Sequence, residues 1–139
     1  MAKEELNVPT ELRYTAEHEW VSVKGDIATV GITDYAQSQL GDIVYVETPG
    51  ADDEATKGNA IGSVESVKSV SDIYAPVSGT IVEVNEVLSD SPEQVNEDPY
   101  GEGWMFRIQL SDKAELDDLL KAKEYVALIR GDHPSAQNK

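Results

Sequence analysis

The sequence predicts a mainly β domain, a small sandwich or barrel with one short internal helix and a helical C-terminus. Two observations support this. Short runs of valine, isoleucine and aromatic residues recur along the chain, separated by glycine, proline and aspartate. Helical patterns are confined to residues 34–40 and the region after residue 111. With 139 residues, the chain is long enough for one domain with its own core.

The composition argues against several functional classes. The net charge is −16, from 27 acidic and 11 basic residues, so nucleic acid is repelled and basic docking faces are attracted. The absence of cysteine excludes disulfides, thiol catalysis and zinc–thiolate sites. Only two histidines occur, His18 and His133, and neither a phosphate-binding glycine loop nor a nucleophile elbow is present. We therefore expect no catalytic residues and no metal site.

The first residues give an expectation about location. They have neither the apolar stretch of a signal peptide nor the arginine-rich character of a transit peptide. No apolar run is long enough to cross a bilayer. These features predict a cytoplasmic protein with no membrane contact, and a mature organellar form with an added initiator methionine stays open. We further expect the protein to be a monomer.

The N-terminal part should contain a polar surface segment followed by a hairpin. We expect residues 1–12 to lie loosely on the surface. Residues 19–24 and 27–32 are two β-prone runs around a tight turn. Trp20 should anchor the core, and His18 is expected to be a surface or partly satisfied histidine.

The short internal helix has clear boundaries. Thr33 suits its N-cap, residues 34–40 its body and Gly41 its end. A strand is expected at residues 42–47, and residues 51–57 are acidic and loop-like.

Lys68 lies between two further β-prone runs, residues 59–65 and 70–76. The small polar residues around it suit a tight connection, so we expect Lys68 at the tip of a β-hairpin, pointing into water. Taken locally, such a lysine is most often a solvated surface charge, and only the rest of the chain gives it a function.

Another strand is expected at residues 80–85, with Val82 and Val84 facing inward. Residues 86–103 should form a long loop with one helical turn near residues 92–95, where Pro92 suits a first helical position.

The C-terminal third should begin with a strand at residues 104–110 and continue as two helices that break near Lys121. Leu116, Leu119 and Leu120 would share one face of the first helix. The prediction is thus a single domain over residues 1–131, with a β core at about 13–110, C-terminal helices at about 112–131 and a flexible tail at 132–139.

Around Lys68, residues 64–79 resemble the H protein of the glycine cleavage system. Further motifs match this family in the same order, at residues 17–21, 31–37, 40–44, 84–85, 96–100 and 103–105. The resemblance covers roughly residues 12–131, and several ordered motifs are far more specific than one lysine.

The resemblance implies a lipoyl-domain-like barrel-sandwich hybrid with (R)-lipoate amide-linked to Lys68. Such a protein is a non-catalytic carrier. It receives an aminomethyl group from the pyridoxal-phosphate-dependent glycine decarboxylase (P protein) and presents it to the tetrahydrofolate-dependent aminomethyltransferase (T protein). It then passes electrons to dihydrolipoamide dehydrogenase (L protein). A lipoylating enzyme is a further implied partner.

The resemblance also suggests residues that contact the loaded arm. An acidic group would hold its cationic end, and the candidates are Glu19 and Asp72. Many family members have histidine where Gln39 stands. A glutamine there can form hydrogen bonds but cannot titrate near neutral pH.

Three alternatives stay open. A biotinyl carrier uses a related fold, but its lysine is typically flanked by methionines, whereas Lys68 is flanked by Val67 and Ser69. Lipoyl domains of 2-oxoacid dehydrogenases are shorter and usually followed by Ala/Pro-rich linkers, which this chain lacks. A lipoyl-relay or pure interaction protein of the same fold is the third.

Overall fold

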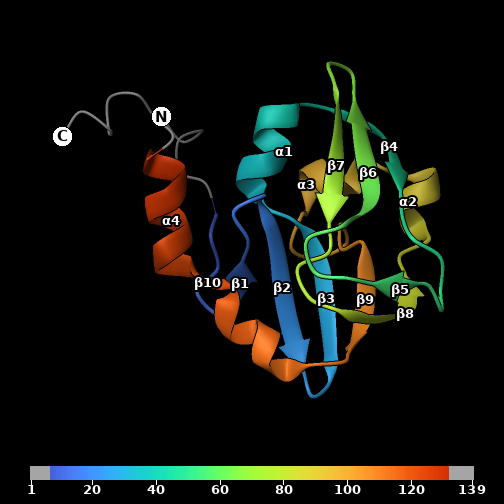
Figure 1. Ribbon diagram of the computed structural model, residues 1–139. Coiled ribbons are helices and arrows are strands. Elements are labelled where there is room, and N and C mark those ends of the chain that lie inside the picture. The colour runs from blue at the N-terminus through green and yellow to red at the C-terminus, as the bar shows by residue number, and fades with distance from the viewer. Residues whose placement is uncertain (1–6, 132–139) are drawn as a thin grey trace.

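The computed structural model describes residues 7–131, which form two antiparallel β-sheets and several short helices (Figure 1). The strands are β1 (Arg13–Tyr14), β2 (Glu19–Lys24), β3 (Ile27–Ile32), β4 (Ile43–Glu47), β5 (Glu54–Ala55), β6 (Ala60–Ser66), β7 (Val70–Tyr74), β8 (Gly79–Val84), β9 (Phe106–Leu110) and β10 (Leu120–Lys121). The helices are α1 (Asp34–Leu40), α2 (Val87–Asp90), α3 (Gln94–Glu97), the 3-10 helix η2 (Lys113–Asp118) and α4 (Ala122–Gly131).

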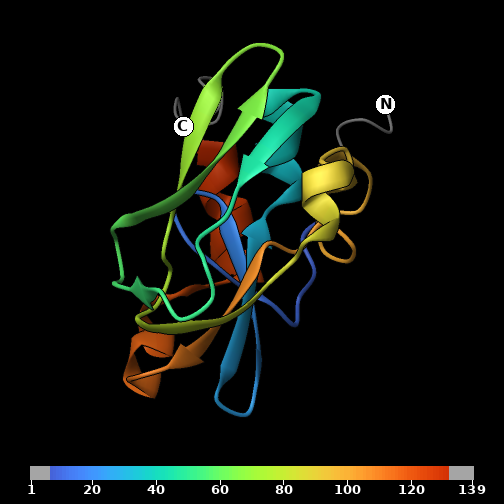
Figure 2. The ribbon, with the colours of Figure 1, turned by 90° about the vertical axis from the view of Figure 1, so that its right-hand side faces the viewer.

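The larger sheet has the strand order β10-β1-β2-β3-β9-β8-β5, and the smaller one the order β4-β6-β7. Figure 2 shows the smaller sheet rising above the larger one, with the β6–β7 hairpin at its top. The predicted mainly β class and the first hairpin are confirmed, and the strand predicted at residues 42–47 is β4. Helix α1 is also confirmed, because the Thr33 hydroxyl accepts a hydrogen bond from the Ala36 N–H and Gly41 ends the helix.

The main core lies between the two sheets. Inward-facing side chains of the smaller sheet meet those of the larger one, and the cluster includes Ile43, Val64, Ile73, Val30, Ile81 and Ile108. A second cluster lies under α4, where Tyr125 stacks on Tyr14 with ring centroids 4.7 Å apart. Trp20 belongs to this second cluster and is almost fully buried, so its role as a core anchor is confirmed.

The predicted inward facing of Val82, in the strand at residues 80–85, was wrong. Ile81 is fully buried, whereas Val82 is 45% exposed. The cause is a break in the β8–β9 register between Ile81 and Glu83, which interrupts the alternation that the prediction assumed. Val84 packs only partly against the core.

The two predicted C-terminal helices and their break near Lys121 are confirmed, whereas the predicted shared face of Leu116, Leu119 and Leu120 is not. The first helix is the 3-10 helix η2, and the short strand β10 separates it from α4. Strand β10 pairs with β1, which turns Leu120 toward the second cluster while Leu119 packs into the main core. The three leucines therefore do not share one face.

Three smaller predictions need correction. The loop at residues 86–103 contains two helical turns, α2 and α3, and the acidic segment 51–57 contains the short strand β5. The described part of the N-terminal segment is held to the body, because Leu12 is buried and the Tyr14 hydroxyl donates to the Pro9 carbonyl. The predicted tail, residues 132–139, lies outside the described residues.

No helix within residues 7–131 is long and apolar enough to cross a membrane.

Candidate functional site

The tip of the β6–β7 hairpin is a tightly bonded turn that carries Lys68. The Ser66 N–H donates to the Ser69 carbonyl at 2.7 Å. The Ser66 hydroxyl oxygen accepts from the N–H groups of Lys68 and Ser69, both at 3.1 Å. One buried serine thus organises the backbone on both sides of the lysine. The prediction that Lys68 lies at an exposed hairpin tip is confirmed.

The Lys68 amine forms no hydrogen bond or ion pair within residues 7–131, and its side chain is exposed. Its stem lies back toward the end of α1, because a β-carbon built on Gly41 would be 3.4 Å from Lys68 Cε. The tip is joined to the same region by a hydrogen bond from the Val67 N–H to the Asp42 carbonyl, at 3.1 Å. The turn and the lysine stem therefore rest against the end of α1, while the amine stays accessible to another protein.

Asn96, at the third position of α3, braces this region. Its side-chain N–H groups donate to the Gly41 carbonyl and to Gln37 Oε1, both at 2.9 Å. Its Oδ1 accepts from the Ile43 N–H at 2.8 Å. One amide thus joins the body of α1, its end and the start of β4. Nothing local in the sequence marks this role, since Asn96 lies more than 50 residues from Gly41 and Ile43.

Glu19 is only 1% exposed and does not lie open on the surface. Its Oε1 accepts from the Thr15 hydroxyl at 2.6 Å, and its Oε2 accepts from the Tyr74 N–H at 3.0 Å. Burial raises the pKa of Glu19 from 4.5 to about 7, although both hydrogen bonds oppose that rise and exposed Glu17 adds slightly to it. Glu19 therefore links the start of β2 to the end of β7.

Asp72 and Gln39 lie elsewhere around the hairpin. Asp72 stands on β7 opposite Ser63, with its side chain exposed. Gln39 is exposed in the last turn of α1, next to the Gly41 region that supports the lysine. Within the described residues, neither side chain has a hydrogen bond to Lys68 or to Glu19. The structure thus leaves the three predicted arm-contacting residues separate: one is buried and two are exposed.

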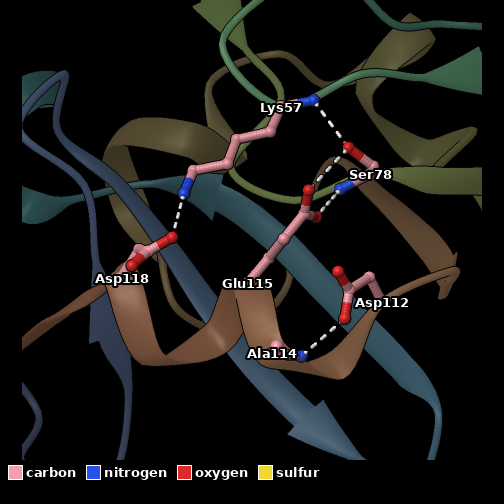
Figure 3. Close-up of polar contacts among 6 residues, drawn as sticks. All are labelled: Lys57, Ser78, Asp112, Ala114, Glu115 and Asp118. Atoms are coloured by element: carbon pink, nitrogen blue, oxygen red, sulfur yellow. Dashed lines mark hydrogen bonds and ion pairs between the residues drawn. The ribbon is translucent and has the colours of Figure 1, made fainter.

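A cavity of about 320 Å³ opens near the base of the hairpin. Glu19, Glu17 and Tyr74 contribute to its lining, together with Lys57 and Asp118. Figure 3 shows how η2 is held at this place. Lys57 Nζ lies 2.7 Å from Asp118 Oδ2, which closes an ion pair between the loop before β6 and the end of η2.

The second contact in Figure 3 is made by Glu115 on η2. Its Oε1 accepts from the Ser78 N–H at 2.6 Å, and its Oε2 accepts from the Ser78 hydroxyl at 3.1 Å. The Ser78 hydroxyl in turn accepts from the Lys57 N–H at 2.9 Å. Sequence reasoning gave no signal for this network, since a glutamate in an acidic helix carries no mark of its partner.

The chemistry available in this arrangement is limited. Within residues 7–131, no group of three or more histidine, aspartate or glutamate side chains is placed to hold a metal ion. The hairpin tip offers a primary amine on a four-carbon stem, held on a braced turn. Such a group can be acylated and can then present its acyl chain to other proteins.

Comparison with known proteins gives consistent results. A family model described as "Glycine cleavage H-protein" matches residues 12–132. A "Glycine cleavage system H protein" from Staphylococcus haemolyticus is 60% identical over 124 residues, which cover 89% of this chain and 98% of the relative. The crystal structure of a glycine cleavage system H protein from Mycobacterium marinum superposes with a TM-score of 0.79 at 40% identity. It covers 86% of this chain and 97% of its own.

Proposed function

The chain belongs to the glycine cleavage H-protein family, and we propose that Lys68 is where it carries the family's lipoyl group. Members of this family are lipoyl carriers of the glycine cleavage system and do not catalyse its reactions themselves. The fold agrees with the barrel-sandwich hybrid of lipoyl domains.

The exposed Lys68 amine is the observation that carries this proposal. An amide on Nζ needs an amine that an acylating enzyme can reach, and within residues 7–131 no carboxylate holds this one. The Ser66 hydroxyl and the Val67–Asp42 backbone hydrogen bond hold the turn in place. The residues present therefore fit the group, and the lack of cysteine is no obstacle because the sulfur belongs to the cofactor.

When bound, the lipoyl group supplies a disulfide that accepts the aminomethyl group and two electrons. The chain itself supplies position. The hairpin carries the attachment point beyond the body of the molecule, as Figure 1 shows, and Gly41 leaves room for the lysine stem. The charge of −16 speeds encounter with basic docking faces without requiring tight binding. These properties suit a carrier that visits several enzymes in turn.

We further propose that the loaded arm contacts residues around the hairpin. The side chains of Asp72 and Gln39 are exposed, so an arm attached to Lys68 could contact them. Glu19 supports it by lining the cavity near the hairpin base. A cation at that cavity would favour the ionised form of the Glu19 carboxyl, whose pKa burial raises to about 7. A direct test compares release of the aminomethyl group from loaded wild type and Glu19→Ala without partner enzymes. Equal rates would reject the role of Glu19.

The partners belong to the same proposal: glycine decarboxylase, aminomethyltransferase, dihydrolipoamide dehydrogenase and a lipoylating enzyme. So do the monomeric state and the cytoplasmic location. Size-exclusion chromatography of the purified protein and fractionation of the cells that make it would test these last two points.

Mass analysis of the protein from cells that synthesise lipoate tests the central proposal. We expect one lipoyl group, placed on Lys68 by peptide mapping, and none on Lys68→Arg, which keeps the charge but cannot form the same amide. A biotinyl group would support the biotin-carrier alternative. An unmodified Lys68, or modification that persists in Lys68→Arg, would overturn the assignment. Reconstitution of glycine decarboxylation with the lipoylated protein then separates a glycine-cleavage carrier from a lipoyl relay.

A further inference from the structure

The outward side of the three-stranded sheet has an unusual composition next to Lys68. Strand register places Tyr45 opposite Glu65 and Glu65 opposite Val70, so these side chains form one row across β4, β6 and β7. All three are exposed, whereas Val46 and Val64 of the next row are buried. Tyr45 is 55% exposed and Val70 is 65% exposed. This row is the last one before the turn that carries the lysine.

Apolar exposure gathers at this place. Six large hydrophobic residues within residues 7–131 are strongly exposed, and four of them lie on β4 or at the hairpin tip: Val44, Tyr45, Val67 and Val70. Exposed apolar side chains that cluster commonly mark a binding surface, and a tyrosine is a frequent anchor of such surfaces. We call the surface formed by Tyr45, Glu65, Val67 and Val70, with Glu47, Ser63 and Asp72 two register positions farther from the tip, the outer face.

The carboxylates of the outer face are unpaired. Glu47 lies opposite Ser63, and Ser63 lies opposite Asp72. Neither these two acids nor Glu65 forms a side-chain hydrogen bond or ion pair within the described residues. Two apolar side chains, Tyr45 and Val70, flank the free carboxylate of Glu65, and two further free carboxylates lie nearby. Such a surface is complementary to an apolar pocket that is bordered by lysine or arginine.

The reach of Lys68 indicates which partner must cover this surface. Before acylation, the amine is only a four-carbon stem away from the backbone of the turn. The acylating enzyme must therefore bring its active site to the hairpin tip itself. There the amine attacks the carbonyl carbon of an activated acyl donor, the amide bond forms, the donor's leaving group departs and the amine loses a proton to solvent. Enzymes that later meet the longer acylated arm can act from farther away.

We propose that the outer face is the docking surface for the lipoylating enzyme, with Tyr45 as the apolar anchor and Glu47, Glu65 and Asp72 as the partners of basic side chains. This inference rests on the proposed function, because it requires Lys68 to be the acylated residue. Tyr45 and Val70 act by positioning the protein substrate and take no part in the chemistry.

In vitro acylation of the full chain tests the inference. The probes are a purified lipoylating enzyme and octanoyl- or lipoyl-adenylate, and the product is quantified by intact mass. We expect Tyr45→Ser and Val70→Ser each to raise the KM for the protein substrate roughly tenfold while kcat stays near that of wild type. Val82→Ser is the matched control, because Val82 is 45% exposed on β8 in the other sheet. Its KM should stay within about twofold of wild type.

A second experiment tests the contribution of charge with the double variant Glu47→Gln, Asp72→Asn. This double variant should raise KM at low salt and show a weaker salt dependence than wild type. Thermal unfolding of every variant shows whether it is folded at the assay temperature. If wild type is not acylated on Lys68, the proposed function fails. If wild type is acylated and Tyr45→Ser and Val70→Ser match Val82→Ser, the function stands and the docking surface is overturned.

Discussion

The side-chain stem of Lys68 lies against Gly41, which ends α1. A β-carbon on Gly41 would be 3.4 Å from Cε and 3.8 Å from Nζ of the lysine. Gly41 has φ 84° and ψ −159°, a backbone conformation that is essentially restricted to glycine. The same residue thus ends the helix, turns the chain into β4 and leaves room for the lysine.

Gly41→Ala should destabilise the protein by about 1–3 kcal/mol, because alanine is strained in this conformation. Chemical denaturation monitored by circular dichroism measures the loss. The β-carbon would also contact the lysine stem, so we expect slower acylation of Lys68 in the folded variant.

Gly25→Ala is the control for this prediction. Gly25 also has a positive φ, of 60°, in the turn between β2 and β3, but a β-carbon there would meet nothing within 4 Å. It should cost less stability than Gly41→Ala and leave acylation unchanged. An equal effect of both variants on acylation would contradict a specific role for Gly41.

Asn96→Ala should cost about 2–3 kcal/mol, because it leaves the Gly41 carbonyl and the Ile43 N–H without their partner. Native-state hydrogen exchange should show faster exchange at Ile43, which tests the brace directly. Gln37→Ala removes only one of the bonds to Asn96 and should cost less. Unchanged exchange at Ile43 in Asn96→Ala would show that the brace is not needed.

These residues also show how far sequence reasoning could reach. The Thr33 cap, α1 and the Lys68 hairpin were predictable because their signals are local: a capping hydroxyl, a terminal glycine and two β-prone runs around a turn. The outward orientation of Val82 was not predictable, because the register break in β8 depends on the pairing with β9. Strand β10 likewise exists only because β1 is there to pair with it.

The residues of the candidate site likewise include some that the sequence predicts and some that it does not. Lys68 was found by its place in an ordered set of motifs. The burial of Glu19 was not foreseen, because its partner Tyr74 is 55 residues away and its exposure depends on the packing of both sheets. Asn96 had no signal for its role, since an asparagine in a loop-like segment is ordinarily a turn residue.

Glu19 should make stability depend on pH between its unfolded pKa of 4.5 and its native pKa of about 7. In this window the native carboxyl keeps a proton that the unfolded chain has released. Stability therefore falls as the pH rises through the window, and the penalty is complete above pH 7. The difference between the two pKa values corresponds to about 3 kcal/mol at most.

Glu19→Gln removes this titration. Its free energy of unfolding relative to wild type should therefore rise between pH 5 and pH 8 by up to about 3 kcal/mol. Urea denaturation at several pH values measures the difference. Parallel pH profiles for wild type and Glu19→Gln would contradict the raised pKa.

The two contacts that hold η2 should differ in strength. Glu115 accepts two hydrogen bonds from Ser78 in a partly buried place, so Glu115→Ala should cost about 2 kcal/mol and respond little to salt. The Lys57–Asp118 ion pair is exposed, with side chains 37% and 65% accessible. Asp118→Ala should therefore cost less than about 1 kcal/mol, and that cost should shrink at high salt. Denaturation of both variants at low and high ionic strength tests the order, and an equal, salt-sensitive loss would show that charge and not hydrogen bonding holds η2.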